Sequence, residues 1–235
     1  MPEPRRLYVI GDIHGRADLL ERMIAAISGD LQTRPLDQCL TVTLGDYIDR
    51  GLDSRGVVER LAHNPFPTDY IALKGNHEDL LTTFLKDPAS GDLWRRNGGL
   101  ETLHSYGVDV APLMRGRDYA ETAAALRAAL PPEHAAFFAG LPLTLTAQRY
   151  FLCHAGVRPG IPLKRQSEAD LLWIRDEFLD STADFGRVVV HGHTPVWEPE
   201  VCANRINVDT GAFMTGRLTC AVLEDTDIRF LTATL

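Results

Sequence analysis

Three short, almost uniformly apolar runs in the first part of the chain constrain the fold most. They are Leu7–Ile10, Leu40–Leu44 and Tyr70–Leu73. Runs of this kind are typical of strands that are buried on both faces. The stretches between them, Ala17–Ile27 and Ser54–Ala62, have the helical spacing of apolar residues. The alternation therefore predicts a β-α-β-α-β series with a largely parallel sheet and right-handed crossovers.

The remaining chain turns helical and then returns to strands. We expect a third helix from His77 or Glu78 to about Leu85, and two more over Tyr119–Leu130 and Glu133–Ala139. Further strands are expected at Leu143–Thr146, Tyr150–Cys153, Val188–Val190, Arg205–Val208, Leu218–Leu223 and Ile228–Thr232. A hairpin turn over Glu224–Asp227 joins the last two. Since no repeat or long linker interrupts the pattern, we expect residues 1–235 to form a single domain.

Composition excludes several classes of protein. The net charge of −8 gives no general attraction for nucleic acid or for an anionic membrane. No apolar stretch approaches the ~20 residues that span a bilayer. The 4 cysteines are scattered without a C-x-x-C pair, which argues against a disulfide framework and a structural zinc site. We therefore expect a cytoplasmic protein that binds neither nucleic acid nor membrane, and the oligomeric state stays open.

Glycine-flanked polar motifs follow each of the first three predicted strands. These motifs read GDIHG, GDYIDRG and GNHE. Their reactive residues are Asp12 and His14 in the first, Asp46, Asp49 and Arg50 in the second, and Asn76 and His77 in the third. Ligands of an open α/β sheet bind outside the carboxyl ends of its strands, so these loops should converge. A single motif of this type more often marks a turn, but three of them favour a common site.

Two later strands end in the same way. Tyr150–Cys153 leads into HAG with His154, and Val188–Val190 leads into HGHT with His191 and His193. Carboxylate, amide oxygen and imidazole are ligands that suit Mn²⁺, Fe or Zn²⁺. The five strand ends together predict a centre with two metal ions.

The five motifs, in this order, resemble those of the phosphoprotein phosphatase family, a branch of the calcineurin-like metallophosphoesterases. The resemblance extends from Gly11 to about Gly211. It implies an α/β fold in which a β-sandwich of two mixed sheets is flanked by helices (α/β/β/α). It also implies two divalent ions, Mn²⁺ first and Fe or Zn²⁺ as alternatives. The implied ligands are Asp12, His14 and Asp46 for one ion, and the bridging Asp46, Asn76, His154 and His193 for the other.

The resemblance also assigns roles in catalysis. It implies that a hydroxide held between the metals attacks a phosphomonoester in line, while His77 protonates the leaving oxygen and Asp49 orients His77. Arg50 would bind the phosphate together with a second arginine, for which Arg175 is the candidate. The alternatives are a helix cap for His77, a turn residue for Asp49 and a surface helix arginine for Arg175.

Several other residues have structural interpretations. We expect the three tryptophans to pack and Glu78 to support its loop without binding metal. Asp209 either lines the site or belongs to a turn, and His191 is left out of the ligand set. Ser90–Gly116 and Arg158–Gln166 are expected to be loops that govern substrate choice. The tryptophans are Trp94, Trp173 and Trp197.

Asp49, Glu78 and Thr194 favour a bacterial or phage-type Ser/Thr protein phosphatase, acting on a phosphoprotein or a small phosphoester. The alternative is a symmetrical diadenosine tetraphosphate hydrolase, a class that typically lacks the Asp of GDYIDRG and carries GNHD and GHW. Nucleases and cyclic-nucleotide phosphodiesterases usually end in G-H-x-H, which this chain lacks. A pseudoenzyme that binds phosphorylated partners is disfavoured because every implied ligand and the acid are present.

Overall fold

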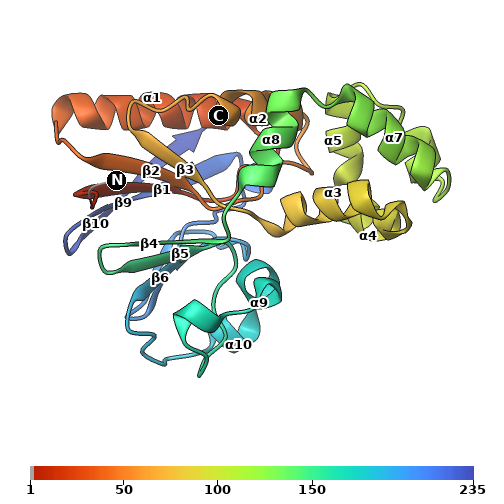
Figure 1. Ribbon diagram of the computed structural model, residues 1–235. Helices are drawn as coiled ribbons and strands as arrows, with labels where there is room; N and C mark the ends of the chain where they lie inside the picture. The colour runs from red at the N-terminus through yellow and green to blue at the C-terminus, as the bar shows by residue number, and fades with distance from the viewer. Residues whose placement is uncertain (1–2) are drawn as a thin grey trace.

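The computed structural model describes residues 3–235 and shows two five-stranded sheets stacked between helices (Figure 1). The first sheet has the order β10 (Asp227–Thr234), β9 (Arg217–Glu224), β1 (Arg6–Ile10), β2 (Cys39–Thr43), β3 (Asp69–Ala72). The second has the order β4 (Thr144–Ala147), β5 (Tyr150–Cys153), β6 (Val188–His191), β8 (Arg205–Asn207), β7 (Glu200–Val201). This is the α/β/β/α sandwich that the motifs predicted.

Both sheets are mixed. In the first sheet β1, β2 and β3 run parallel, whereas β9 and β10 are antiparallel additions. In the second, β5, β6 and β8 run parallel between antiparallel edge strands. The carboxyl ends of the parallel strands are the edges that carry the polar motifs, so this topology creates the site.

Alternating burial explains why the strands appear as continuous apolar runs. In β1, Tyr8 packs into a core with the outer helices, whereas Leu7 and Val9 pack between the two sheets. In β5, Leu152 joins the core between the sheets, and Phe151 faces the helices on the far side. The prediction of burial on both faces is therefore confirmed for β1 and β2, whereas β3 is only partly buried.

The helices form three groups (Figure 1). Along the first sheet lie α1 (Ala17–Thr33), α2 (Ser54–Ala62) and α8 (Pro132–Gly140). A helical extension contains α3 (Asn76–Lys86), α4 (Gly91–Arg96), α5 (Gly99–Ser105), α6 (Ala111–Met114) and α7 (Tyr119–Ala129). Against the second sheet lie α9 (Glu168–Trp173) and α10 (Asp176–Leu179), and the short α11 (Ala212–Thr215) precedes β9.

The expectation of a loop over Ser90–Gly116 is wrong, because α4, α5 and α6 occupy it. These helices span four to seven residues, too few to show a helical period in the sequence. Tertiary packing stabilises them, since the fully buried Trp94 and Leu103 join the main core. The short 3₁₀ turn at Leu163–Arg165 likewise lies in the other expected loop.

Most other element boundaries agree with the sequence to within one or two residues. The third helix begins at Asn76, one residue earlier than expected, and α1 continues beyond Ile27 to Thr33. The hairpin is confirmed, since Glu224 pairs with Asp227 across a two-residue turn. No helix among residues 3–235 is long and apolar enough to cross a bilayer, and the cytoplasmic location stays a prediction.

Candidate metal centre and phosphate site

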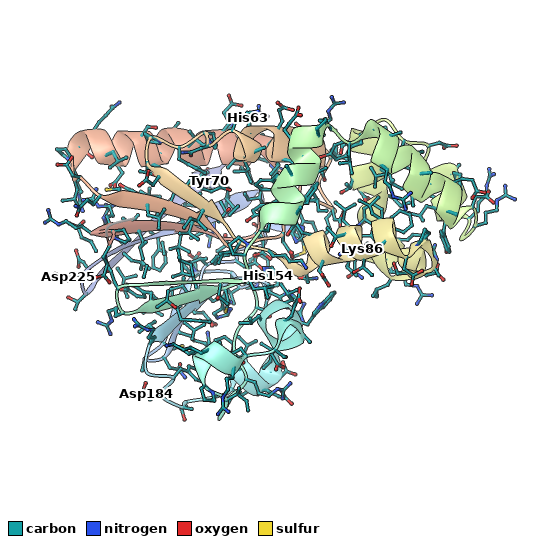
Figure 2. All side chains as sticks on the ribbon, in the orientation of Figure 1. His63, Tyr70, Lys86, His154, Asp184 and Asp225 are labelled. Carbon is teal, nitrogen blue, oxygen red and sulfur yellow. The ribbon has the colours of Figure 1, made fainter. Side chains whose placement is uncertain are left out.

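The polar motifs converge where the carboxyl ends of the two sheets meet. Figure 2 shows His154 at this junction, beside the start of the helical extension and far from the exposed Asp184 and Asp225. All six residues with an implied ligand role are buried, with at most 6% of their surface exposed. A buried concentration of carboxylates and imidazoles is costly unless the groups share a cation or a proton.

Two clusters of potential ligands share one carboxylate. His14, Asp46 and His77 form the first, and Asp46, His154 and His193 form the second; in each, the ligand atoms lie within 4.8 Å of one another. The two oxygens of Asp46 divide between them, with Oδ2 3.4 Å from His14 Nε2 and Oδ1 3.4 Å from His154 Nε2. A carboxylate placed in this way can bridge two metal ions.

Backbone carbonyls fix the tautomers of two of these histidines. The Nδ1–H of His14 donates to the carbonyl of Ile48 at 2.8 Å, and the Nδ1–H of His154 donates to the carbonyl of Leu44 at 3.1 Å. Each Nε2 therefore carries a lone pair, and both face Asp46. This orientation of imidazoles by backbone acceptors is typical of metal-ligating histidines.

The Asn76 side chain provides the test of whether a cation fits the second cluster. Its Oδ1 lies 2.7 Å from His154 Nε2 and 2.9 Å from His193 Nδ1. His154 Nε2 is an acceptor, as is the amide oxygen, and two acceptors at this distance repel each other unless a cation lies between them. The donor set of oxygen and imidazole nitrogen, without thiolate, suits a hard or borderline divalent ion.

Protonation states agree with this interpretation. Burial lowers the pKa of His14 well below its usual range and that of His154 to about 3, so both rings are neutral, as metal ligands must be. Burial also lowers the pKa of His193. Conversely, burial together with neighbouring carboxylates raises the pKa of Asp12 and Asp46 well above the usual value. Arg50 lowers both pKa values but does not offset these effects, and divalent cations would supply the further positive charge.

Asp12 belongs to neither cluster, although the resemblance implies that it is a ligand. Its carboxylate accepts the backbone N–H of His193 at 3.2 Å, and Asp46 is close enough to raise its pKa. Asp209 lies beside it and is also buried, with a pKa that burial raises to about 6. The sequence left Asp209 undecided between turn and site. The structure shows both features, since its Oδ1 also accepts the N–H of Gly211 at 2.8 Å.

Glu78 supports the loops as expected. Its carboxylate accepts N–H groups from Asp46 and Tyr47, each at 2.8 Å, and from Gly75 at 3.0 Å. Asp46 itself has a left-handed backbone with φ of 53°, a conformation that surrounding contacts must hold. Only glycine fits at position 75, because a Cβ there would lie 2.2 Å from Asp46 Oδ1. The sequence GNHE thus holds the central carboxylate in place.

His77 and Asp49 form a buried pair. The Nδ1–H of His77 donates to Asp49 Oδ2 at 2.7 Å. Its Nε2 lies 3.7 Å from Asp46 Oδ2 and has no hydrogen-bond partner in the described part of the chain. Gly75, not His77, is the N-cap of α3, so the helix-cap alternative is wrong. Burial raises the pKa of Asp49 to about 7 and lowers that of His77.

Arg50 and Arg175 both lie at the site, but they differ in their contacts and in their exposure to solvent. Arg50 donates from Nη1 to His14 Nε2 at 3.1 Å, and its guanidinium lies 5.0 Å from the centre of the Phe213 ring. Arg175 is exposed and donates to Thr194 Oγ1 at 3.2 Å, directly after the HGH motif. Arg175 stands just before α10 and not within a surface helix. No sequence signal identified Phe213.

The tryptophans differ from one another. Trp94 is fully buried, as expected, but its indole N–H also donates to Asp49 at 2.9 Å. Trp173 lies edge-on to His193 with ring centres 6.1 Å apart. The prediction that Trp197 packs is wrong, since 84% of its surface is exposed. His191 packs against Phe178 and joins neither cluster, in agreement with its omission from the ligand set.

The fold and the site define a class of protein, namely an α/β/β/α hydrolase with residues arranged for two metal ions. The family comparison makes this specific: the calcineurin-like phosphoesterase model matches residues 5–228, and the chain belongs to this family. The prediction of a metal-dependent phosphoesterase is thereby confirmed.

Individual relatives match over nearly the whole chain. Serine/threonine-protein phosphatase 2 of Salmonella typhimurium is 28% identical, covering 91% of each chain. The asymmetrical bis(5'-nucleosyl)-tetraphosphatase PrpE of Bacillus cereus is 27% identical, covering 90% of this chain and 87% of its own. Among solved structures, one provisionally described as a diadenosine tetraphosphatase has a TM-score of 0.66 at 22% identity, covering 97% of this chain and 94% of its own.

Proposed function

We propose that this phosphoesterase is a protein phosphatase that hydrolyses phosphoserine and phosphothreonine, using two divalent ions. The observation that carries the proposal is the pair of ligand clusters sharing Asp46. His14, Asp12 and Asp46 would hold one ion, and Asp46, Asn76, His154 and His193 the other. Mn²⁺ is the proposed ion, and Fe or Zn²⁺ are the alternatives that the same oxygen and imidazole donors would accept.

Bound divalent ions would lower the pKa of a water ligand and polarise the phosphoryl oxygens. The chain's own residues would do the rest. Arg50 and Arg175 would bind the peripheral phosphate oxygens, since a guanidinium can donate two parallel hydrogen bonds to them. In its protonated form, His77 would donate the proton on Nε2 to the leaving oxygen, because this nitrogen has no hydrogen-bond partner among residues 3–235. Asp49 would stabilise the charged imidazole and hold the ring in place.

The substrate class rests on sequence similarity. The Salmonella relative named as a Ser/Thr phosphatase supports a phosphoprotein substrate. The chain also has Asp49, the residue that symmetrical diadenosine tetraphosphate hydrolases typically lack. The relatives named as asymmetrical tetraphosphatases favour a second candidate, hydrolysis of dinucleoside polyphosphates. The predicted alternative was a symmetrical hydrolase, so both cleavage patterns belong in the test.

The decisive experiment compares substrates with the Mn²⁺-loaded protein. Turnover of phosphoserine and phosphothreonine peptides should exceed that of diadenosine tetraphosphate, and chelation with EDTA should abolish both. Preferred hydrolysis of the dinucleotide would replace the proposed substrate class, and chromatography of its products would distinguish symmetrical from asymmetrical cleavage. Absence of turnover with Mn²⁺, Fe²⁺, Co²⁺ and Zn²⁺ alike would contradict the catalytic proposal itself.

A further inference from the structure

The buried carboxylate of Asp49 is held mainly by the helical extension. Trp94 of α4 donates its indole N–H to Oδ2 at 2.9 Å, and Thr102 of α5 donates its hydroxyl to Oδ1 at 2.6 Å. The backbone N–H of Asp49 points to Thr102 Oγ1 at 2.9 Å and to Ser54 Oγ at 3.0 Å. Trp94, Thr102 and Asp49 are all fully buried. Asp49 Oδ2 thus accepts from both His77 and Trp94, and Oδ1 accepts from Thr102 and lies 3.2 Å from the same Trp94 nitrogen.

The same helices hold the backbone of the GDYIDRG loop. Asp49 and Arg50 both have left-handed backbones, with φ of 71° and 67°, which cost free energy in residues other than glycine. The N–H of Arg50 donates to the carbonyl of Gly98, in the turn between α4 and α5, at 3.2 Å. A glycine is required there, because φ is +98° and a Cβ would lie 2.7 Å from Arg50 N. The α4–α5 hairpin therefore fixes two consecutive strained residues of the site.

We propose that Trp94 and Thr102 are positioning residues for proton donation by His77, acting through Asp49. Neither side chain hydrogen-bonds to a residue of the ligand clusters, and both hold the carboxylate that orients the imidazole. The α4–α5 hairpin, within the span that the sequence predicted to be a substrate-selecting loop, thus becomes part of the acid-positioning machinery. The inference rests on the proposed role of His77.

A proton donor matters in proportion to the basicity of the leaving group. p-Nitrophenolate is a stable anion and leaves without a proton, whereas phenolate and the alkoxide of serine need one. Loss of acid positioning should therefore slow phenyl phosphate and a phosphoserine peptide far more than p-nitrophenyl phosphate. A merely structural role would slow all three substrates equally. This difference separates positioning from folding.

The experiment uses Mn²⁺-loaded Trp94→Phe and Thr102→Val variants, which keep shape and remove one donor each. We expect kcat on phenyl phosphate and the peptide to fall about 10-fold or more, with less than about 2-fold change on p-nitrophenyl phosphate and little change in KM. Thr102→Ser should restore activity because it restores the hydroxyl. Trp197→Phe and Thr122→Val are matched controls, since neither contacts Asp49, and should resemble the wild type.

His77→Asn provides the reference. It should show the same dependence on the leaving group at larger amplitude, and adding Trp94→Phe to it should have no further effect. If His77→Asn shows no such dependence, the acid role of His77 is wrong and the inference falls with it. His77→Asn can instead show the dependence on the leaving group while Trp94→Phe and Thr102→Val lack it or slow all substrates equally. In that case only the inference about Trp94 and Thr102 is wrong. If Trp94→Phe fails to fold, the comparison of Thr102→Val with Thr102→Ser tests the inference by itself.

Discussion

Two regions of this protein bury carboxyl groups, and the pKa values shift in opposite directions in the two regions. At the ligand clusters, Asp12, Asp46 and Asp209 lie together, and Arg50 is the charged side chain that lowers the pKa of all three. Between α1 and the first sheet, Asp30 of α1 receives two hydrogen bonds of 2.6 Å from Arg229 of β10. The pKa of Asp30 is lowered from its ordinary value even though burial opposes this, whereas the pKa values at the clusters are raised.

Around Asp30, the protein itself supplies the hydrogen-bond donors and the positive charges that the buried carboxylate needs. Tyr8 donates its hydroxyl to Asp30 at 2.6 Å, and Arg6 lies 3.6 Å away and also pairs with Glu224. These contacts tie α1 to β1, β9 and β10. At the ligand clusters the protein does not supply enough of either. Acids outnumber nearby cations there, and imidazole lone pairs face carboxylates. A buried carboxylate with its partners stabilises the fold, and one without them is available for a ligand.

The largest expected effect is at the shared carboxylate. Asp46→Asn should lower kcat/KM for p-nitrophenyl phosphate with Mn²⁺ by about 10³-fold or more, because a neutral amide cannot bridge two cations. Asp30→Asn serves as the control and should leave activity within about 3-fold at 25 °C. Comparable losses in the two variants would remove the functional distinction between the regions.

Asp30→Asn should instead lower stability. Removing the charge leaves Arg229 without its carboxylate partner and Arg6 with Glu224 alone, so the free energy of unfolding should fall by about 3 kcal/mol. Urea unfolding of the metal-free protein measures it. Asp18→Asn on the same helix breaks an exposed pair with Arg16 and should cost less than about 1 kcal/mol. An Asp30 effect no larger than the Asp18 effect would mean that the network contributes little.

Asp209→Asn should stabilise the metal-free protein, whereas Asp30→Asn should destabilise it. In EDTA, this change removes one of several neighbouring buried negative charges, while the amide oxygen can still accept the N–H of Gly211. The free energy of unfolding should therefore rise by about 1 kcal/mol, as is common where a site trades stability for function. A loss of stability in urea would show that Asp209 is a structural turn residue above all.

The smallest effect concerns pH. Because the pKa of Asp30 is lowered on folding, its stabilising contribution is complete above the ordinary value of about 4 and disappears as the pH falls through the lowered folded value. The stability difference between wild type and Asp30→Asn should thus stay constant from about pH 7 to 5 and narrow below about pH 4. A stability difference that narrows as the pH is raised would contradict the lowered pKa of Asp30 in the folded protein.

The sequence determined the framework of the site because its signals are local. Apolar runs predicted the buried strands, and glycine-flanked motifs at their ends marked where polar side chains leave the sheet. The histidine and carboxylate residues of the two clusters were therefore named in advance, as was the supporting role of Glu78. These features depend on a few consecutive residues and on the rule that parallel strands end at one edge.

Only the tertiary structure decided what long-range contacts create. Asp30, Arg6 and Arg229 carry no local pattern, and 199 positions separate Asp30 from Arg229. Trp94 was expected to pack, and it does, but its bond to Asp49 joins residues 45 positions apart. The helices around it are too short for a periodic signal, and burial of their few apolar residues stabilises them. The strand ends marked the candidate ligands, and the packing of distant segments determined which contacts hold them.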